Sequence, residues 1–182
     1  MANFLMLYST TDGHTLEICR RLQQQIEAGS QSVTLLPIDE APATAAELEA
    51  FDRIVLGASI RYGRHGKPVA DFIQRHRALL ERKPNAFFSV NLVARKPQKN
   101  TPQTNPYLKK FLRRVRWQPK QMAVFAGKLD YPRYGRLDRA IIRFIMLITG
   151  GPTDPASTTE FTDWSRVDAF AQELCRHDSM NG

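Results

Sequence analysis

The chain has 182 residues, of which 42% are hydrophobic, and this suits one globular domain with a single sizeable core. Its formal net charge is +8, and no uninterrupted apolar stretch approaches the roughly 20 residues that cross a bilayer. No basic segment precedes the first apolar run, so we expect no secretory signal, free thiols at Cys19 and Cys175, and a reducing, cytoplasmic compartment.

The positive charge is concentrated in residues 95–143. This segment holds 14 lysines and arginines against two acids, a net of +12, whereas the remainder of the chain carries −4. A slightly acidic domain with one strongly basic segment indicates an anionic partner: a membrane surface, a nucleic acid or an acidic ligand.

The predicted elements alternate along the chain. Short apolar runs predict strands at residues 3–9, 33–36, 53–58, 86–93 and 122–126. Apolar residues at helical spacing predict helices at residues 15–28, 43–50, 68–81 and 164–176. Strands that alternate with helices favour a parallel sheet covered on both faces, so we expect an α/β three-layer sandwich with the strand order 2-1-3-4-5.

Two segments exceed what a minimal five-stranded fold of this kind needs. Residues 95–120 follow the fourth strand and contain a predicted helix at 107–114, and residues 129–159 adjoin the fifth strand. We expect both to be basic insertions in a single domain that covers residues 1–178, with a short tail at 179–182.

The most specific motif is the turn after the first strand, which consists of Ser9, Thr10, Thr11, Asp12, Gly13, His14 and Thr15. The helix that follows begins with unpaired backbone N–H groups and the positive end of its dipole, and the hydroxyls add donors. The turn has neither the lysine of a nucleoside-triphosphate loop nor the three glycines of a dinucleotide fingerprint. It therefore suits one terminal monophosphate. The pattern Thr-x-x-Gly-x-Thr resembles the FMN phosphate loop of flavodoxins, and the alternative is an ordinary polar turn.

Ligands of such sheets bind at the carboxyl ends of the strands, which selects two more loops. The loop after the third strand contains Ser59, Ile60, Arg61, Tyr62 and Gly63. The end of the fourth strand, with the loop that begins around Asn91, contains Ser89, Asn91, Leu92, Val93 and Ala94. We expect the ring of Tyr62 to stack on a flavin, and the amides and small apolar side chains of the second loop to contact its edge and face. The alternatives are a surface tyrosine in a turn and a buried strand end with nothing bound.

Arg136, Arg139 and Arg143 recur at intervals of three and four residues, so a helix places them on one face. An apolar face that includes Ile145 lies opposite. Such a helix either lies in a membrane interface or packs its apolar face on the core. The basic stretch at 109–116 allows the same two interpretations.

Other catalytic constellations are missing from the sequence. It contains no HExxH, CxxC or GxSxG pattern, so we expect no metal site and no nucleophilic triad. His65 is either a proton carrier or, more simply, a solvated loop histidine.

Six segments distinguish this chain from a generic α/β domain: residues 57–63, 89–97, 101–105, 110–112, 131–134 and 162–164. Together they resemble the flavodoxin-like, menaquinone-dependent protoporphyrinogen IX dehydrogenase (quinone) family of bacterial haem biosynthesis. The resemblance covers nearly the whole chain, including basic insertions that ordinary flavodoxins lack. It implies a flavodoxin-like fold with FMN as the cofactor, held by the three loops above.

The resemblance also implies an activity. A member of this family oxidises protoporphyrinogen IX to protoporphyrin IX, a change of six electrons in three flavin turnovers, and passes the electrons to a membrane quinone, menaquinone or ubiquinone. The flavin carries the chemistry, so we assign no catalytic side chain. The substrate's propionates and an anionic membrane surface both suit basic residues, and we expect these contacts from Arg95, Lys96, Arg133, Arg136, Arg139 and Arg143. We expect peripheral association with the inner face of the cell membrane and leave homo-oligomerisation open.

Three other functions are compatible with parts of the sequence. An electron-transfer flavodoxin is usually acidic, which the segment of net charge +12 disfavours. An NAD(P)H:quinone oxidoreductase would show rapid flavin reduction by the nicotinamide. Nucleic-acid binding by residues 95–120 would leave the FMN loop unexplained and finds few aromatic residues there, so we expect no nucleic-acid partner.

Overall fold

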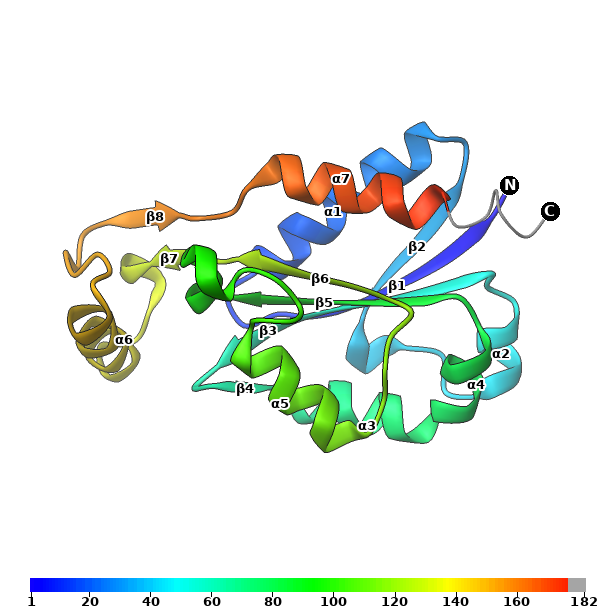
Figure 1. Cartoon of the computed structure of the whole chain (residues 1–182), viewed down its shortest axis with the longest axis horizontal. Coiled ribbons are helices and arrows are strands. Elements are labelled where there is room, and N and C mark those ends of the chain that lie inside the picture. The colour runs from blue at the N-terminus through cyan, green and yellow to red at the C-terminus, as the bar shows by residue number, and fades with distance from the viewer. Residues whose placement is uncertain (177–182) are drawn as a thin grey trace.

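The computed structural model describes residues 1–176, so the predicted tail at 179–182 lies outside the described residues. Its main sheet has five parallel strands: β1 (Asn3–Ser9), β2 (Ser32–Pro37), β3 (Arg53–Arg61), β5 (Asn85–Asn91) and β6 (Gln121–Ala126). They lie in the order β2-β1-β3-β5-β6, with the two-residue β4 (Arg64–His65) paired to the end of β3. The expected α/β class and strand order are confirmed (Figure 1).

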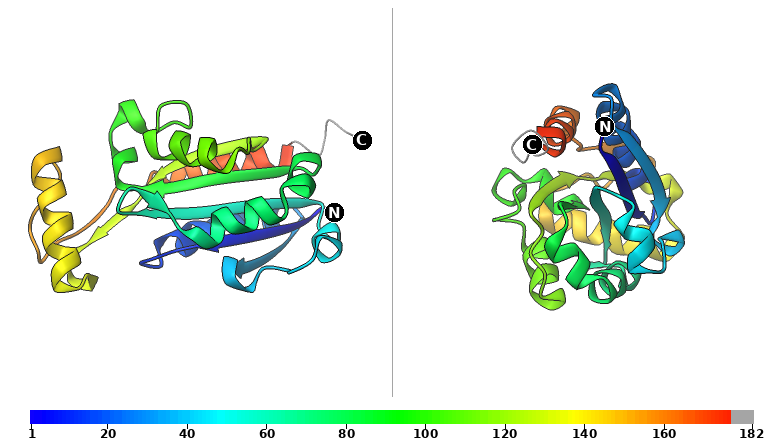
Figure 2. Two further views of the ribbon diagram at one scale, coloured as in Figure 1. Left: turned by 90° about the horizontal axis from the view of Figure 1, so that it is seen from below. Right: turned by 90° about the vertical axis from the view of Figure 1, so that its right-hand side faces the viewer.

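Helices cover both faces of the sheet and make three layers (Figures 1 and 2). One face carries α1 (His14–Ala28) and α7 (Trp164–Arg176). The other face carries α2 (Ala45–Glu49), α3 (Lys67–Arg75), α4 (Arg77–Arg82) and α5 (Pro106–Val115). The helix predicted at 68–81 is divided between α3 and α4 at His76, whose backbone leaves the helical region (φ −109°, ψ 19°) where its buried ring packs on Phe72.

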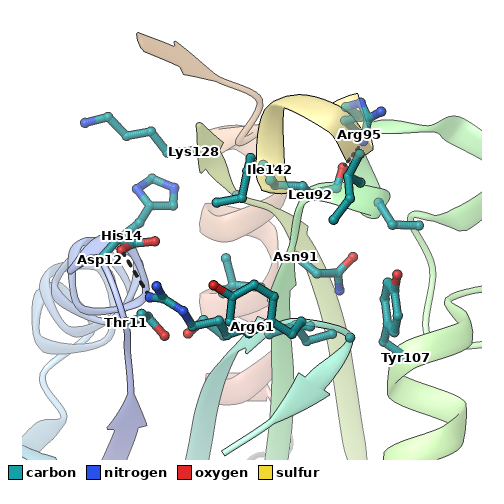
Figure 3. A pocket seen from close by; sticks show the side chains of 18 of the residues that line it. Thr11, Asp12, His14, Arg61, Asn91, Leu92, Arg95, Tyr107, Lys128 and Ile142 are labelled. Atoms are coloured by element: carbon teal, nitrogen blue, oxygen red, sulfur yellow. Dashed lines mark hydrogen bonds and ion pairs between the residues drawn. The ribbon is translucent and has the colours of Figure 1, made fainter. Parts of the chain in front are cut away.

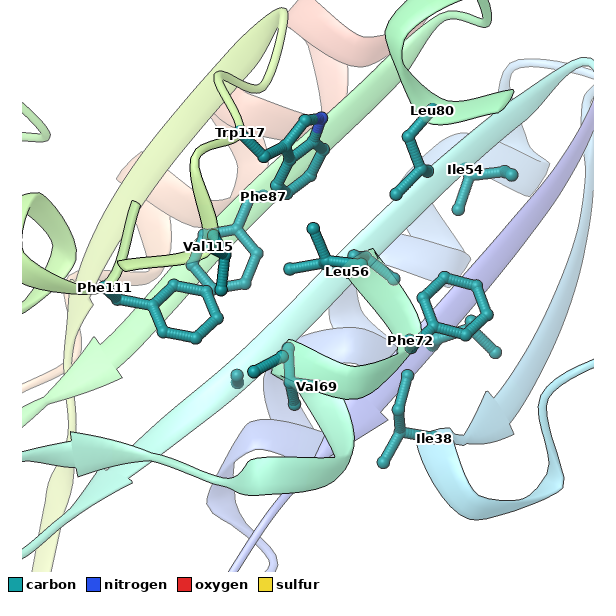
Figure 4. Packing of buried hydrophobic residues seen from close by; sticks show 14 of the residues in the cluster. Ile38, Ile54, Leu56, Val69, Phe72, Leu80, Phe87, Phe111, Val115 and Trp117 are labelled. Atoms are coloured by element: carbon teal, nitrogen blue, oxygen red, sulfur yellow. The ribbon is translucent and has the colours of Figure 1, made fainter. Parts of the chain in front are cut away.

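Alternate residues of each strand point to opposite faces, and this divides the core into two clusters. Along β1, Leu5 and Leu7 face the layer of α3 and α5, whereas Phe4 and Met6 face α1 and α7. All four side chains are fully buried. Figure 4 shows the first cluster, which side chains of α3, α4 and α5 complete. The loops at the carboxyl ends of the strands therefore project from a tightly packed base.

The second insertion is a helix carried on a hairpin. The strand β7 (Lys128–Asp130) follows β6 beyond the main sheet and pairs antiparallel with β8 (Thr158–Glu160), and α6 (Arg136–Thr149) lies between them in the chain. A small separate cluster that includes Leu129 and Met146 packs α6 onto this hairpin. As a result α6 lies across the carboxyl ends of the strands, at the end of the molecule opposite the N-terminus (Figure 2).

Candidate functional site

A cavity of about 310 Å³ lies between the carboxyl ends of the strands and α6 (Figure 3). The sheet brings the three predicted loops together around it. The predicted cofactor-binding residues that line it are Thr10, Thr11, Asp12, His14, Thr15, Ser59, Ile60, Arg61, Tyr62, Gly63, Asn91, Leu92 and Val93.

Four predicted residues lie beside the cavity without lining it: Ser9, Gly13, Ser89 and Ala94. Gly13 has the left-handed backbone (φ +86°) that turns the chain into α1. Ser89 and Ala94 are buried, and both hydrogen-bond the side chain of Asn91, Ala94 through its backbone amide. These residues shape the loops that face the cavity.

The first loop has the geometry of an anion site. The Gly13 amide donates to Thr10 Oγ1 at 3.0 Å, which closes the turn, and in the described part of the chain no side chain caps α1. The amides of its first turn therefore stay available at the cavity. The side chain of Thr15, a residue only 1% exposed, lines the cavity, and its hydroxyl has no hydrogen-bond partner among the described residues. Buried hydroxyls without partners are rare, and the terminal phosphate of FMN would satisfy this one.

Tertiary contacts bring cations to this loop, which has none of its own. Arg133 Nη1 donates to the Asp12 carbonyl at 3.3 Å, and Arg61 Nη1 lies 4.0 Å from the Asp12 carboxylate. Lys128 of β7 lines the cavity on the same side as His14 (Figure 3). Burial raises the pKa of the Asp12 carboxyl, while Arg61 and Arg133 oppose that shift. The three cations come from separate elements, so the loop sequence alone could not indicate them.

His14 fixes the start of α1 against the segment before α7. Its Nδ1 is 2.9 Å from a Glu17 carboxylate oxygen and its Nε2 is 2.6 Å from the Thr162 hydroxyl. A carboxylate only accepts, so Nδ1 carries a hydrogen. The Thr162 hydroxyl also donates to the Ala126 carbonyl at 2.7 Å, which ties the loop to the end of β6. The first loop is thus held at a set position relative to the sheet edge.

The second loop is a two-residue hairpin. Tyr62 and Gly63 both have positive φ, 49° and 74°, as a type I′ turn requires, and Arg61 pairs with Arg64 across it. Tyr62 is 55% exposed, and the Arg61 guanidinium lies over its ring at 5.4 Å from the centroid. The predicted stacking residue therefore stands at the mouth of the cavity.

A buried polar network forms the floor of the cavity. Asn91, at which the fourth strand ends two residues earlier than predicted, donates to Ser89 Oγ at 3.1 Å and accepts from Asn105 Nδ2 at 3.1 Å. Ser89 Oγ is in turn hydrogen-bonded to His65 Nε2 at 2.8 Å. Burial, with a contribution from Arg114, lowers the pKa of His65 to about 3. His65 is therefore a neutral, buried residue, and its interpretation as a solvated loop histidine is wrong.

Two polar contacts, here called clasps, fasten α6 over the cavity. In the Asp138 clasp, the carboxylate accepts hydrogen bonds from Arg61 and from the Tyr62 hydroxyl. In the Thr149 clasp, Arg95 Nη2 donates to the Thr149 hydroxyl at 2.9 Å. Burial lowers the pKa of the Arg95 guanidinium, which the sequence predicted as a substrate or membrane contact and which here secures the end of α6.

The other five cations predicted as substrate or membrane contacts occupy different surroundings. Lys96 lines the cavity, and Arg133 contacts the first loop. Arg139 donates to three backbone carbonyls of the turn before α6, at 3.1, 3.5 and 3.2 Å. Arg136 and Arg143 are exposed on α6, and neither forms an ion pair within the described residues.

The far wall of the cavity comes from the insertions. It consists of Lys99, Tyr107, Lys128, Tyr134, Ile142, Ile145, Met146 and Thr149, together with Arg95 and Lys96. The helical spacing of Ile142, Ile145 and Thr149 was visible in the sequence, but spacing does not reveal what a helix covers.

A second cavity, of about 290 Å³, shares Gly63 and Tyr107 with the first, and its other lining residues are Arg64, His65, Lys110, Phe111 and Arg114.

Residues 5–156 match the flavodoxin domain family (Flavodoxin_5), and the chain therefore belongs to that family. Over 172 residues it is 46% identical to the protoporphyrinogen IX dehydrogenase (quinone) of Escherichia coli K12, with 93% of each chain covered. It is 44% identical over 170 residues to the protein of the same name from Leishmania major, covering 93% of this chain and 73% of the relative. The family resemblance inferred from the sequence is confirmed, as is FMN as the cofactor of the domain.

Solved structures agree on the fold. Flavodoxin 1 of Bacillus cereus superposes with a TM-score of 0.56 at 17% identity, covering 97% of this chain and 99% of that one. The rubredoxin oxygen:oxidoreductase of Desulfovibrio gigas gives a TM-score of 0.57 at 12% identity, covering 96% of this chain and 35% of that one.

Proposed function

We propose that this protein oxidises protoporphyrinogen IX to protoporphyrin IX and transfers the electrons to a membrane quinone. The observation that carries the proposal is the cavity itself, in which a flavodoxin cradle is closed by a wall of basic and apolar side chains from the insertions. The reaction balances when three quinones take up the six electrons and six protons that the porphyrinogen loses. FMN, when bound, supplies the two-electron redox chemistry.

Different loops would bind the phosphate and the ring system of FMN. The first turn of α1 and the hydroxyl of Thr15 would hold its phosphate, with the charge balanced by Arg61 and Arg133. The second loop and the segment from Asn91 would contact the ring system, because they line the cavity beside the phosphate loop. The buried network beneath Asn91 keeps that edge of the site from shifting.

The far wall suits an amphipathic macrocycle with carboxylates on one edge. Ile142 and Met146 offer an apolar surface, and Lys96 and Lys99 line the same cavity with ammonium groups. Charge-assisted hydrogen bonds from these lysines would hold propionates and orient the macrocycle against the flavin. The cations of the adjoining second cavity extend the basic rim.

We further propose that α6 rests on an anionic membrane surface. Four large apolar side chains face outward on it: Leu137 (74% exposed), Phe144 (62%), Leu147 (68%) and Ile148 (66%). Met146 is the one described α6 residue that is buried, and the packing of α6 on its small cluster leaves these four side chains uncovered, which supports this proposal over packing of the whole apolar face on the core. The exposed Arg136 and Arg143 border the outward face, as in helices that lie in a membrane interface. None of the described helices combines the length and hydropathy of a membrane-crossing segment.

The activity is tested by the visible spectrum of the FMN-loaded protein under anaerobic conditions. Adding protoporphyrinogen IX should bleach the flavin and produce a porphyrin Soret band, and a quinone should restore the flavin absorbance. NADH should leave the flavin oxidised. Rapid bleaching by NADH or NADPH, with no response to protoporphyrinogen, would establish the NAD(P)H:quinone oxidoreductase instead.

Membrane association is tested by co-sedimentation with vesicles. Binding should need anionic lipid, weaken in high salt and fall when Arg136 and Arg143 are both changed to Glu. The matched control changes Lys109 and Arg113, exposed on α5, to Glu, and this should reduce binding less. Equal binding to neutral and anionic vesicles, or salt-sensitive retention on DNA with none on vesicles, would overturn the membrane proposal.

A further inference from the structure

One flank of α6 is polar at its two ends and apolar between them. Asp138, Ile142, Ile145 and Thr149 follow one another at intervals of four, three and four residues, so they form one stripe. The two ends of the stripe are polar and bound in the clasps, whereas the two isoleucines between them line the cavity. At 1.5 Å per residue the clasps are about 16 Å apart along the helix. The stripe therefore contains an apolar window between two polar fastenings.

Ile145 belongs to two surfaces at once. It lines the cavity, it is 39% exposed, and it is next in the chain to Phe144 of the outward face. Its neighbours Phe144 and Ile148 are exposed on the outward face, and Ile142 lies on the cavity side. Apolar surface is therefore continuous from the outside of α6, past Ile145, into the cavity.

Another part of the cavity wall is basic. Lys96 and Lys99 lie there, and their ammonium groups suit a carboxylated substrate. An isoprenoid quinone has no charge and carries a long hydrocarbon tail, so moving it past these cations would remove their water without giving them a new polar partner. The apolar window offers it a route between the clasps that is lined by the hydrocarbon side chains of Ile142 and Ile145.

We infer that the tailed quinone enters the cavity between the Asp138 and Thr149 clasps, and that Ile145 controls this route. The quinone ring passes the window while its tail stays against the outward face of α6 and the lipid. The inference rests on the proposed function, because it takes a membrane quinone as the electron acceptor. It assigns separate entrances to the anionic donor and the lipid-dissolved acceptor.

The experiment compares Ile145→Trp with Leu147→Trp as the matched control. Both changes add an indole to α6 and keep it apolar, but only position 145 lines the cavity. The FMN-loaded variants are placed on anionic vesicles, reduced with dithionite and reoxidised either by ubiquinone with a long tail, dissolved in the vesicles, or by tail-less menadione. Ile145→Trp should slow reoxidation by the tailed quinone at least tenfold and change the menadione rate less than threefold. Leu147→Trp should change neither rate by more than threefold.

Two further measurements separate a blocked window from a loss of membrane docking. Co-sedimentation with vesicles should be the same for both variants, so that a loss of docking is recognised. A tailed azidoquinone should label Ile142 in the vesicle-bound apoprotein, and Ile145→Trp should abolish that labelling. Equal slowing by both quinones, or undiminished labelling of Ile142, would overturn the window. Because dithionite replaces the porphyrinogen, failure of the proposed donor reaction is detected separately, by the anaerobic spectrum.

Discussion

Asp138 and Arg61 are 77 positions apart in the chain, and they form an ion pair across the mouth of the cavity. Arg61 stands at the end of the third strand of the flavodoxin sheet, whereas Asp138 belongs to the first turn of the inserted helix. Tyr62 adds a hydrogen bond to the same carboxylate. The second loop and the insertion are thereby coupled, so a substitution in one should alter the conformation of the other.

Asp138→Asn should loosen the N-terminal end of α6. The pair is partly exposed, with the Arg61 side chain at 38% and that of Asp138 at 25%, so the free energy of unfolding should fall by only about 0.2–1 kcal/mol. Hydrogen exchange of the α6 amides should nevertheless become faster, because the helix has few buried contacts besides the clasps. Glu81→Gln, which breaks the exposed pair with Arg77, is the control. Unchanged protection of α6 would contradict the clasp.

Thr15→Val should affect cofactor binding and apoprotein stability in opposite ways. Loss of one partner of a charge-assisted hydrogen bond should weaken FMN binding by about 1–3 kcal/mol, measured by quenching of flavin fluorescence. The apoprotein should be no less stable in urea, because its Thr15 hydroxyl is buried without a partner among the described residues. Thr34→Val on β2, away from the cavity, should leave FMN affinity unchanged. If Thr15→Val retained full affinity, the hydroxyl would have no part in holding the phosphate.

Gly57→Ala should destabilise the sheet next to the second loop. A Cβ at this position would lie 2.2 Å from Cζ of the buried Phe88 ring, and such overpacking costs about 1–3 kcal/mol in urea unfolding. Adding Phe88→Leu should recover part of the loss, which a double-mutant cycle measures. Gly135→Ala is the matched control, since a Cβ there meets nothing within 4 Å. Strictly additive effects would show that the two residues are not in contact.

His65→Gln should flatten the dependence of stability on pH. The pKa of His65 is lowered to about 3 in the folded protein from its ordinary value of 6.5, so below pH 6.5 the unfolded chain binds a proton that the folded chain does not. Stability is therefore full above pH 6.5 and is lost as the pH falls toward 3, by at most about 1.4 kcal/mol per unit. Glutamine keeps a hydrogen-bond partner for Ser89 and does not titrate. Urea unfolding at pH 7 and pH 4.5 measures the slope, and an unchanged slope would show that His65 is not buried neutral.

His76→Gln should reduce the same slope by a smaller amount. Burial and the neighbouring Arg75 also lower the pKa of His76, so its contribution has the same sign. A larger effect from His76 than from His65 would contradict the stronger lowering of the pKa at His65.

The sheet and the position of the first loop were predictable because their signals are local. β1 is a continuous apolar run that ends in hydroxyls and a glycine, and the structure bounds it at the predicted residues 3–9. The strand order followed from the alternation of strands and helices, which constrains parallel sheets strongly. By contrast, β7 and β8 are three residues each and pair across the whole of α6, so no local pattern marked them.

The placement of individual charged residues was not predictable. Arg139 and Arg143 are four residues apart and therefore lie on one face of α6. Arg139 nevertheless donates hydrogen bonds to backbone carbonyls, whereas Arg143 is exposed. The difference arises from the turn before α6, whose carbonyls point toward Arg139. Likewise, the sequence could not show that Asp138 would meet Arg61, because such contacts depend on where the insertion folds back.

The hairpin that carries α6 has a consequence for the engineering of this protein. Asp130 and Thr158 are paired neighbours on β7 and β8, so the 27 residues between them leave and return at one point of the fold. Replacing that stretch with an Asn-Gly turn would close the hairpin directly and remove α6 from the cavity wall. The reverse graft, onto a plain flavodoxin, would add one of the two segments that wall this cavity, while Lys96, Lys99 and Tyr107 would have to come from the other.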